Sequence, residues 1–460
     1  MHNSRTGSNK RASRLLDRLI TNASASQKLS NGGMLQSESY TEIHELTANS
    51  KSDLLATLTS LKVEARDPRE VAVTFSKESL DLLVCYALKS NPLEIRLEAL
   101  RIIANALLLS PNLRKQFDAV PILADQYKGA SADEEFVVSR IMFLLTIEPR
   151  TYEALVLKWL HEYVLLHVTR HAEGDLCDSS LPALTETCKL LFNILCKFSY
   201  DTPSYDDLIG PLSSIIKRQP RILNSVSRSI ISCLLKLPCT VDVYFRDEAP
   251  TELSEVFFEL LAKEVQPQSF DTPGLDDSIV PLLLLLNNIF TSAHNAEVIE
   301  YFKAMIFPSE VERSRPLGQS SSLASNLLQI TSKPTFMKSR EVIYQLMWDA
   351  SDHDVHKFIY HIGFGYAIGY IMSHEIAVPE DILRENSPNV PRDNINPVTG
   401  QRVENECKIP TLANMTEDEK EREAERLFVL IERMRANGVI KVENPVRTAV
   451  ESGRFQELPD

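Results

Sequence analysis

The chain repeats one helical design four times. Each of four segments has apolar residues at helical spacing, with one or two polar side chains among them. The segments, with their embedded polar residues, are 91–109 with Asn105, 184–198 with Asn193, 227–237 with Ser232 and 280–290 with Asn287 and Asn288. A helix that cannot bury both faces alone buries them by stacking on the next unit. The pattern therefore predicts an all-α helical-repeat superhelix, with a concave groove lined by one helix of each repeat.

Companion helices are predicted around these segments, and strands are not. Glycine is scarce, with 14 in 460 residues, and alternating runs bounded by Asn-Gly or Asp-Gly turns are essentially missing. Apolar periodicity predicts further helices at 13–20, 54–63, 77–89, 136–147, 152–168, 208–217, 253–265, 296–306, 323–330 and 340–348. The loops between them are rich in Ser, Pro, Gly and Asp.

The bulk composition excludes several classes of protein. A net charge of -14 argues against general nucleic-acid binding, because phosphate neutralisation needs a positive face. None of the seven cysteines forms a CxxC pair, which is typical of buried free thiols in a reducing compartment. The N-terminus has no hydrophobic signal core, and the longest apolar run, 279–289, is too short to span a bilayer. These observations predict a soluble cytosolic protein.

No motif for bond chemistry, a metal or a cofactor is present. Two histidine groups lack the further ligands at defined spacing that zinc requires, so we predict exposed or helix-end histidines; they are His161, His167 and His171, and His353, His356 and His361. Gly363, Gly365 and Gly369 lack the strand and βαβ frame of a dinucleotide loop. Carboxylates at 133–135 and 276–277 are expected to be solvated helix caps.

The embedded asparagines have two interpretations. A buried amide is costly unless it is hydrogen-bonded. Each asparagine could bind a neighbouring loop of its own chain, or the set could form a ladder that pairs with the main chain of a bound peptide. Four arginines could supply charge for a peptide carboxylate or could simply lie on a solvated face; they are Arg66, Arg96, Arg101 and Arg140.

The C-terminal region contains the strongest single helix signal. A turn at 396–400 and a proline-rich stretch precede Thr416, which forms a capping box with Glu419. The helix that follows has an apolar stripe and ends at Asn437-Gly438. Three regions are therefore predicted: a repeat domain at 1–376, an extended Pro-rich tether at 377–415, and a C-terminal helix and tail at 416–460.

Several stretches resemble one known family. INPVTGQRVENE followed by MTEDEKEREAERLFVLIERM resembles the C-terminal region of the synembryn family (resistance to inhibitors of cholinesterase). Further matching stretches occur in the same order along nearly the whole chain: SLKVEARDP, LEALRIIANALLLSP, IMFLLT, KLLFNILCKFS and KFIYHIGFGYAIG. The resemblance implies an armadillo/HEAT-like superhelix with a tethered amphipathic C-terminal helix.

The resemblance also implies a function. Members of the family are guanine-nucleotide exchange factors and folding chaperones for heterotrimeric G-protein alpha subunits. In the family, a groove takes the C-terminal helix of the alpha subunit. The residues of this chain that match groove positions are Arg66, Asn105, Arg140, Phe143 and Asn193. In the family, a tail helix contacts the GTPase core, and the residues of this chain that lie on the matching helix are Leu427, Phe428 and Ile431.

These expectations have limits set by the same sequence. We expect no catalytic residue, metal, cofactor or direct nucleotide binding. We expect a cytoplasmic monomer that associates with the membrane or cell cortex only through its partner. Animal members carry an acidic, serine-rich phosphorylation segment before INPVTG; this chain has only Ser387 there, so that regulation is not carried over. An armadillo-type adaptor that binds peptides without exchange activity is the alternative, although an adaptor would not need the tail helix.

Overall fold

The computed structural model describes most of the chain. The described residues are 13–20, 48–147, 154–197, 205–237, 251–378, 395–396, 399–405 and the single positions 416, 420, 422 and 426. They are almost entirely helical: within them β-pairing is limited to one isolated bridge, between Ile395 and Arg402. The predicted all-α fold class is confirmed.

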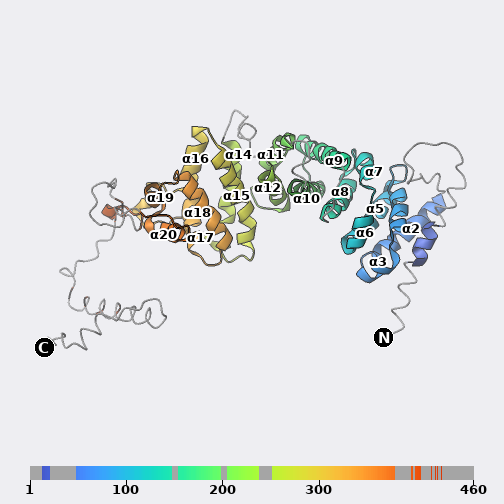
Figure 1. Cartoon of the computed structure of the whole chain (residues 1–460), viewed down its shortest axis with the longest axis horizontal. Helices are drawn as coiled ribbons and strands as arrows, with labels where there is room; N and C mark the ends of the chain where they lie inside the picture. The colour runs from blue at the N-terminus through green and yellow to red at the C-terminus, as the bar shows by residue number, and fades with distance from the viewer. Residues whose placement is uncertain are drawn as a thin grey trace.

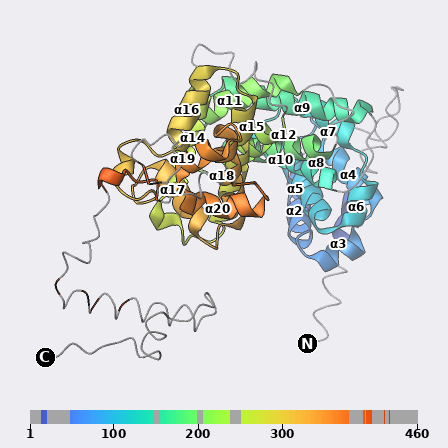
Figure 2. The same cartoon turned by 60° about the vertical axis from the view of Figure 1, so that its left-hand side comes forward.

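The helices form two rows that run along the chain. In the first, which we call the inner row, each helix packs on the next; it consists of α2 (Ala48–Glu64), α5 (Leu93–Leu109), α8 (Ala132–Ile147), α10 (Leu181–Lys197), α12 (Ser225–Lys236), α15 (Leu275–Ser292) and α18 (Met337–Ala350). The second, the outer row, consists of α7 (Val120–Gln126), α9 (Ala154–Glu173), α11 (Ile209–Arg218) and α14 (Glu252–Glu264). Figures 1 and 2 show an arch, with α8, α10 and α12 on its inner side and α9 and α11 on its outer side.

Shorter helices complete both ends of the arch. Near the N-terminal end lie α3 (Pro68–Thr74), α4 (Lys77–Ala87) and α6 (Pro111–Gln116), and near the C-terminal end lie α16 (Ala296–Ile306), α17 (Leu323–Ser332), α19 (Val355–Ile362) and α20 (Phe364–Ser373) (Figures 1 and 2). One apolar core extends from Leu15 to Ile371 without interruption. The stability of each repeat therefore depends on its neighbours, as in other solenoids.

Local sequence signals set the helix boundaries. Ser110 ends α5 and begins α6: its amide donates to Ala106 O, and its hydroxyl accepts from the amide of Leu113. Pro111 follows at the first position of α6, where a missing N–H costs nothing. Ser76 forms a capping box with Ser79 at the start of α4. The chain thus turns at defined residues between stacked helices.

The sequence identified four of the seven inner-row helices, whereas α2, α8 and α18 were expected only as companion helices. The four segments with embedded polar residues are α5, α10, α12 and α15, which all belong to this row. Five helices were not expected, namely α3, α6, α7, α19 and α20. They have 6 to 10 residues, which is too few turns for a periodic apolar pattern to stand out.

A buried polar cluster joins α8 to α9 and α10, contrary to the sequence expectation. Glu135 is fully buried and accepts hydrogen bonds from Thr187 Oγ1 at 2.8 Å and from Arg170. His171 Nε2 lies 3.0 Å from both Glu135 oxygens, and His167 Nδ1 lies 3.4 Å from one. Burial opposes ionisation, but these polar contacts outweigh it and hold the pKa of Glu135 well below its ordinary value.

Two predictions about polar residues fail in whole or in part. Glu135 is not a solvated cap. The histidines expected to be exposed or at a helix end are all buried, and among His161, His167 and His171 only His171 lies in the last turn of its helix, α9. The partners of Glu135 lie more than thirty residues away in sequence, so the acidic first turn of α8 gave no sign of them. Within the described residues no group of three or more His, Cys, Asp or Glu side chains is arranged to hold a metal ion.

The described cysteines are free thiols that differ in burial, and Cys85 is partly buried. Cys188 and Cys233 are buried, as predicted, whereas Cys177 and Cys196 are exposed. None of the helices in the described ranges combines the length and the apolar character that crossing a membrane requires.

A buried arginine organises the C-terminal end of the repeat domain. Arg313 lies in the loop between α16 and α17 and is 1% exposed. Its Nη2 donates to the carbonyls of Tyr360 at 3.0 Å and His361 at 3.3 Å, which end α19, and its Nη1 donates to Gly400 O at 3.1 Å. A cation at a helix C-terminus is favoured by the helix dipole. One guanidinium thus joins a loop, a helix end and the turn at 396–400.

We expect Glu135→Gln to lower the free energy of unfolding by about 3 kcal/mol, because it leaves Arg170 and two histidines without a buried anion. Urea denaturation followed by circular dichroism measures this change. Asp133→Asn removes an exposed carboxylate from the same helical turn and is the matched control, with an expected change below about 0.5 kcal/mol. Equal effects of the two variants would contradict the role given to the cluster.

The half-buried ring of His361 predicts a pH dependence of stability. It stacks on Phe307 at 4.0 Å between ring centroids, and burial, with the nearby charges of Arg313, Lys303 and Lys357, lowers its pKa to about 4. Asp352 is the acidic group that opposes this shift. Because the unfolded chain binds the proton first, stability is full above pH 6.5 and is lost as the pH falls toward 4.

We expect His361→Phe, which keeps a stacked ring, to remove about 2 kcal/mol of the stability difference between pH 7 and pH 4. The measurement is urea denaturation of both proteins across this range. Parallel pH profiles for the two proteins would contradict the assigned shift.

Candidate partner-binding surface

Helix α8 carries an accessible stripe of mixed chemistry. Phe136, Arg140, Phe143 and Ile147 follow at intervals of four, three and four residues, which places them on one face of the helix. Phe136 and Phe143 are half-buried against the core, and the guanidinium carbon of Arg140 lies 5.9 Å from the centroid of the Phe136 ring. Arg140 has no acidic partner among the described residues. The stripe presents a cation beside aromatic rings, a combination that suits a segment with an apolar face and a carboxylate.

The neighbouring inner-row helices extend this surface with amides. Asn105 lies on α5, which packs on α8; its side chain is half-buried and makes no hydrogen bond with the described part of the chain. Asn193 lies on α10, and its Nδ2 donates to Thr146 Oγ1 at 3.0 Å. Thr146 in turn donates to Phe143 O at 2.7 Å, near the end of α8. Asn105 is therefore available to a partner, whereas Asn193 fastens α10 to α8.

The embedded polar side chains do not form a uniform ladder. Asn105 and Asn193 differ in their hydrogen bonding, and Asn287 on α15 differs from both. The Oδ1 atom of Asn287 is buried and has no hydrogen-bond partner among the described residues. The Ser232 hydroxyl donates to Arg228 O of its own helix at 2.8 Å. We use the name inner-row surface for the accessible residues Asn105, Phe136, Arg140, Phe143 and Asn193.

The four arginines singled out in the sequence divide into two pairs. Arg96 Nη2 lies 2.6 Å from Glu134 Oε1, and Arg101 Nη1 lies 2.8 Å from Glu98 Oε1. Arg66 is exposed in the turn after α2, and like Arg140 it has no acidic partner in the described ranges. Arg66 and Arg140 are thus the members of this group that can supply charge to a partner.

Glu134 is also a buried residue rather than a solvated cap. It is 2% exposed and accepts hydrogen bonds from Ser131 and Arg96. Burial opposes its ionisation, but these hydrogen bonds outweigh burial and lower the pKa of the carboxyl to about 2. Glu134 therefore fixes Arg96 between α5 and α8, which explains why Arg96 is not available at the surface.

The tail residues named in the sequence lie beyond this surface. Leu427, Phe428 and Ile431 are outside the described residues. The amide of Lys420 donates to Thr416 O at 3.0 Å, and positions 420, 422 and 426 are helical. The helix start predicted at Thr416 is consistent with this bond.

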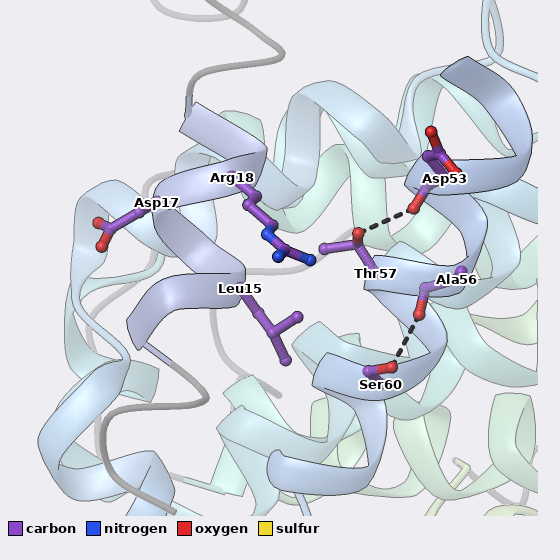
Figure 3. Close-up of a pocket in the computed structure, with 7 residues that line it drawn as sticks. All are labelled: Leu15, Asp17, Arg18, Asp53, Ala56, Thr57 and Ser60. Atoms are coloured by element: carbon purple, nitrogen blue, oxygen red, sulfur yellow. Dashed lines mark hydrogen bonds between the residues drawn. The ribbon is translucent and has the colours of Figure 1, made fainter. Parts of the chain in front are cut away.

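A hollow near the N-terminal end is distinct from the inner-row surface. It has a volume of about 640 Å³ and lies between residues 13–20 and α2 (Figure 3). The hydroxyls of Thr57 and Ser60 are bound to carbonyls of their own helix, at 2.8 and 2.9 Å. Arg18 extends toward Thr57, and Asp17 also lines the hollow (Figure 3). The hydroxyl groups that line the hollow from α2 are therefore already engaged within that helix.

Sequence reasoning missed Phe136 as a member of the inner-row surface. The signal was present, because Phe136 precedes Arg140 by one helical turn. The sequence alone does not show which face of α8 is accessible, because this helix is apolar on most of its circumference. The burial of the residues between Phe136 and Arg140 was needed to identify that face.

The fold is a helical-repeat superhelix, and its inner-row surface combines aromatic rings, a cation and amides. Residues 57–454 match the family model described as guanine nucleotide exchange factor synembryn, so the chain belongs to the synembryn family.

Curated relatives share this similarity to different extents. The synembryn-like chaperone of Schizosaccharomyces pombe is 30% identical over 189 residues, which are 38% of this chain and 34% of that protein. Chaperone Ric-8A of Pongo abelii is 25% identical over 438 residues, 84% of this chain and 81% of that protein. Chaperone ric-8 of Caenorhabditis elegans is 23% identical over 365 residues, 68% of this chain and 61% of that protein.

We expect Asn193→Ala to destabilise the protein by about 1 kcal/mol, because it removes the hydrogen bond to Thr146. Asn105→Ala should change stability by less than about 0.5 kcal/mol, because Asn105 has no such bond. Urea denaturation of both variants and of Thr146→Val, alone and combined with Asn193→Ala, measures the coupling. A large loss at Asn105 would show that its amide is structural.

Proposed function

We propose that this protein is a guanine-nucleotide exchange factor and folding chaperone for heterotrimeric G-protein alpha subunits. The observation that carries the proposal is the family match over residues 57–454, from the repeat domain into the tail. The names of the relatives add the chaperone role. No bond-making step is required, because exchange is a change in the binding equilibrium of a nucleotide held by the partner.

The inner-row surface would receive the C-terminal helix of the alpha subunit. A groove recognises a bound helix by the apolar side chains that the helix carries at intervals of three and four residues. Phe136 and Phe143 offer rings for that face, and Arg140 offers a charge-assisted hydrogen bond to the terminal carboxylate. Asn105 can pair with the main chain, and Arg66 provides a second cation at the N-terminal end of the row. Asn193 contributes by holding α10 against α8.

Exchange requires a difference in affinity between states of the partner. A ligand shifts an equilibrium only through its differential binding of the two states. The protein would bind the GDP-loaded or nascent alpha subunit, draw its C-terminal helix into the groove and stabilise the nucleotide-free form. GTP binding would then favour release. The same preference protects a nascent partner that lacks nucleotide.

The tail helix supplies a second contact with the partner. Leu427, Phe428 and Ile431 would contact the GTPase core while the inner-row surface holds the C-terminal helix. Two linked contacts raise the apparent affinity through effective concentration. A peptide-binding adaptor would use the first contact alone.

The proposal is tested by the rate of GDP release from a purified alpha subunit. We expect stoichiometric full-length protein to accelerate release. A chain ending at Asn405 should bind a peptide with the sequence of the partner's C-terminal helix normally but accelerate release much less. Absence of acceleration by the full chain would overturn the exchange function and leave a chaperone or a peptide-binding adaptor.

We expect Arg140→Ala to weaken binding of this partner peptide about tenfold, since it removes a charge-assisted hydrogen bond worth about 1.4 kcal/mol. Fluorescence anisotropy with a labelled peptide measures this change. Lys263→Ala removes an exposed cation from α14 in the outer row and should have no effect. Equal weakening by both variants would indicate non-specific charge attraction.

A further inference from the structure

The segment around the INPVTG sequence is a turn bound to the repeat domain. Within the turn, the amide of Gly400 donates to Asn396 O at 2.8 Å, and the amide of Asn396 donates to Gln401 O at 2.7 Å. Gly400 has a φ of 68°, in the left-handed region that other residues rarely adopt. A Cβ at this position would lie 2.4 Å from Leu317 Cδ1 in the loop between α16 and α17, so a larger residue would require the Leu317 side chain to move.

Main-chain hydrogen bonds fasten this turn to that loop. The amide of Leu317 donates to Thr399 O at 3.3 Å, and the amide of Arg402 donates to Arg313 O at 2.8 Å. Gln401 Nε2 donates to Ser314 O at 3.2 Å. Backbone pairing of this kind ties the turn to the loop at a fixed register.

Side chains complete the attachment. Arg402 Nη2 lies 2.7 Å from Glu310 Oε2. The buried guanidinium of Arg313 donates to Gly400 O from inside the domain, while its second nitrogen holds the end of α19. The ring of Tyr360 lies 5.0 Å from the guanidinium carbon. A planar fork with several donors can join these segments, whereas a lysine cannot.

We propose that Arg313 is a positioning residue that docks the 395–405 turn and so fixes the point from which the C-terminal tail leaves the repeat domain. This inference rests on the proposed function. With the turn docked, only residues 406–415 separate it from Thr416, ten residues that reach at most roughly 35 Å. Without docking, residues 379–415 would separate the repeat domain from Thr416, and these 37 residues have a maximum reach of roughly 130 Å.

The docked turn therefore raises the effective concentration of the tail helix near a partner held by the inner-row surface. For a flexible linker long enough to span the two contacts, effective concentration falls as about the three-halves power of linker length. A change from ten to 37 residues then corresponds to about a sevenfold loss. The turn also restricts which part of the partner the tail can reach.

Two variants disrupt docking from opposite sides. Arg313→Gln removes the guanidinium from the repeat domain, and Gly400→Val places a branched side chain at a left-handed position against Leu317. Gly400→Val leaves Arg313 in place, so it remains informative if Arg313→Gln unfolds the C-terminal helices. Arg315→Gln, at an exposed position of the same loop, is the matched control.

The experiment has three readouts on the full chain: hydrogen exchange of the Gly400 and Arg402 amides, affinity for a peptide with the sequence of the partner's C-terminal helix, and the concentration that gives half-maximal GDP release. In the wild type and Arg315→Gln we expect protected amides. In Arg313→Gln and Gly400→Val we expect loss of protection, peptide affinity within twofold of wild type, and a half-maximal concentration about sevenfold higher.

The outcomes that overturn the inference are separate from failure of the proposed function. Unprotected amides in the wild type would show that the turn is not docked. Loss of protection with unchanged half-maximal concentration would show that docking has no positioning role. A wild type with protected amides that binds the peptide but releases no GDP would overturn the proposed exchange function, and the positioning role with it, while leaving the docking itself established.

Discussion

The stacking of the inner-row helices is the interaction on which the rest of this structure depends. Each of these helices packs on the next one in the row, and one apolar core runs from Leu15 to Ile371. Burial on both flanks leaves a single face of each helix accessible, and the residues on that face recur at intervals of three and four. The candidate binding surface is thus a consequence of how the repeats pack: Arg140 and Phe143 share the free face of α8, and Asn105 lies on the adjoining helix.

Buried charges fix this stack at two places. Glu135 gathers groups from α9 and α10 onto the first turn of α8, and Arg313 gathers the end of α19 and the 395–405 turn onto the loop after α16. A charge that is removed from water must find partners of defined geometry, so each cluster admits few alternative arrangements. The first cluster holds neighbouring repeats in register, and the second closes the C-terminal end of the row.

The sequence predicted the long helices of the repeats, but it did not predict the shortest helices or the polar contacts between repeats. Apolar periodicity with an embedded amide marks α5, α10 and α15, because the pattern is local to each helix. The partners of Glu135 and of Arg313 lie tens of residues away, and nothing in the local sequence distinguishes a solvated carboxylate from a buried one. The same limit applies to Asn193, whose bond to Thr146 crosses between helices, and to Arg96, which the sequence could not separate from Arg140.

The central claim is that this protein favours the nucleotide-free state of an alpha subunit over its GDP-bound state. The most direct test compares the affinities of the full chain for the two states of one purified alpha subunit by titration calorimetry. The account predicts tighter binding of the nucleotide-free form, by at least about a hundredfold if exchange is to be efficient. Equal affinity for the two states would contradict it, because a ligand that does not discriminate between two states cannot shift their equilibrium.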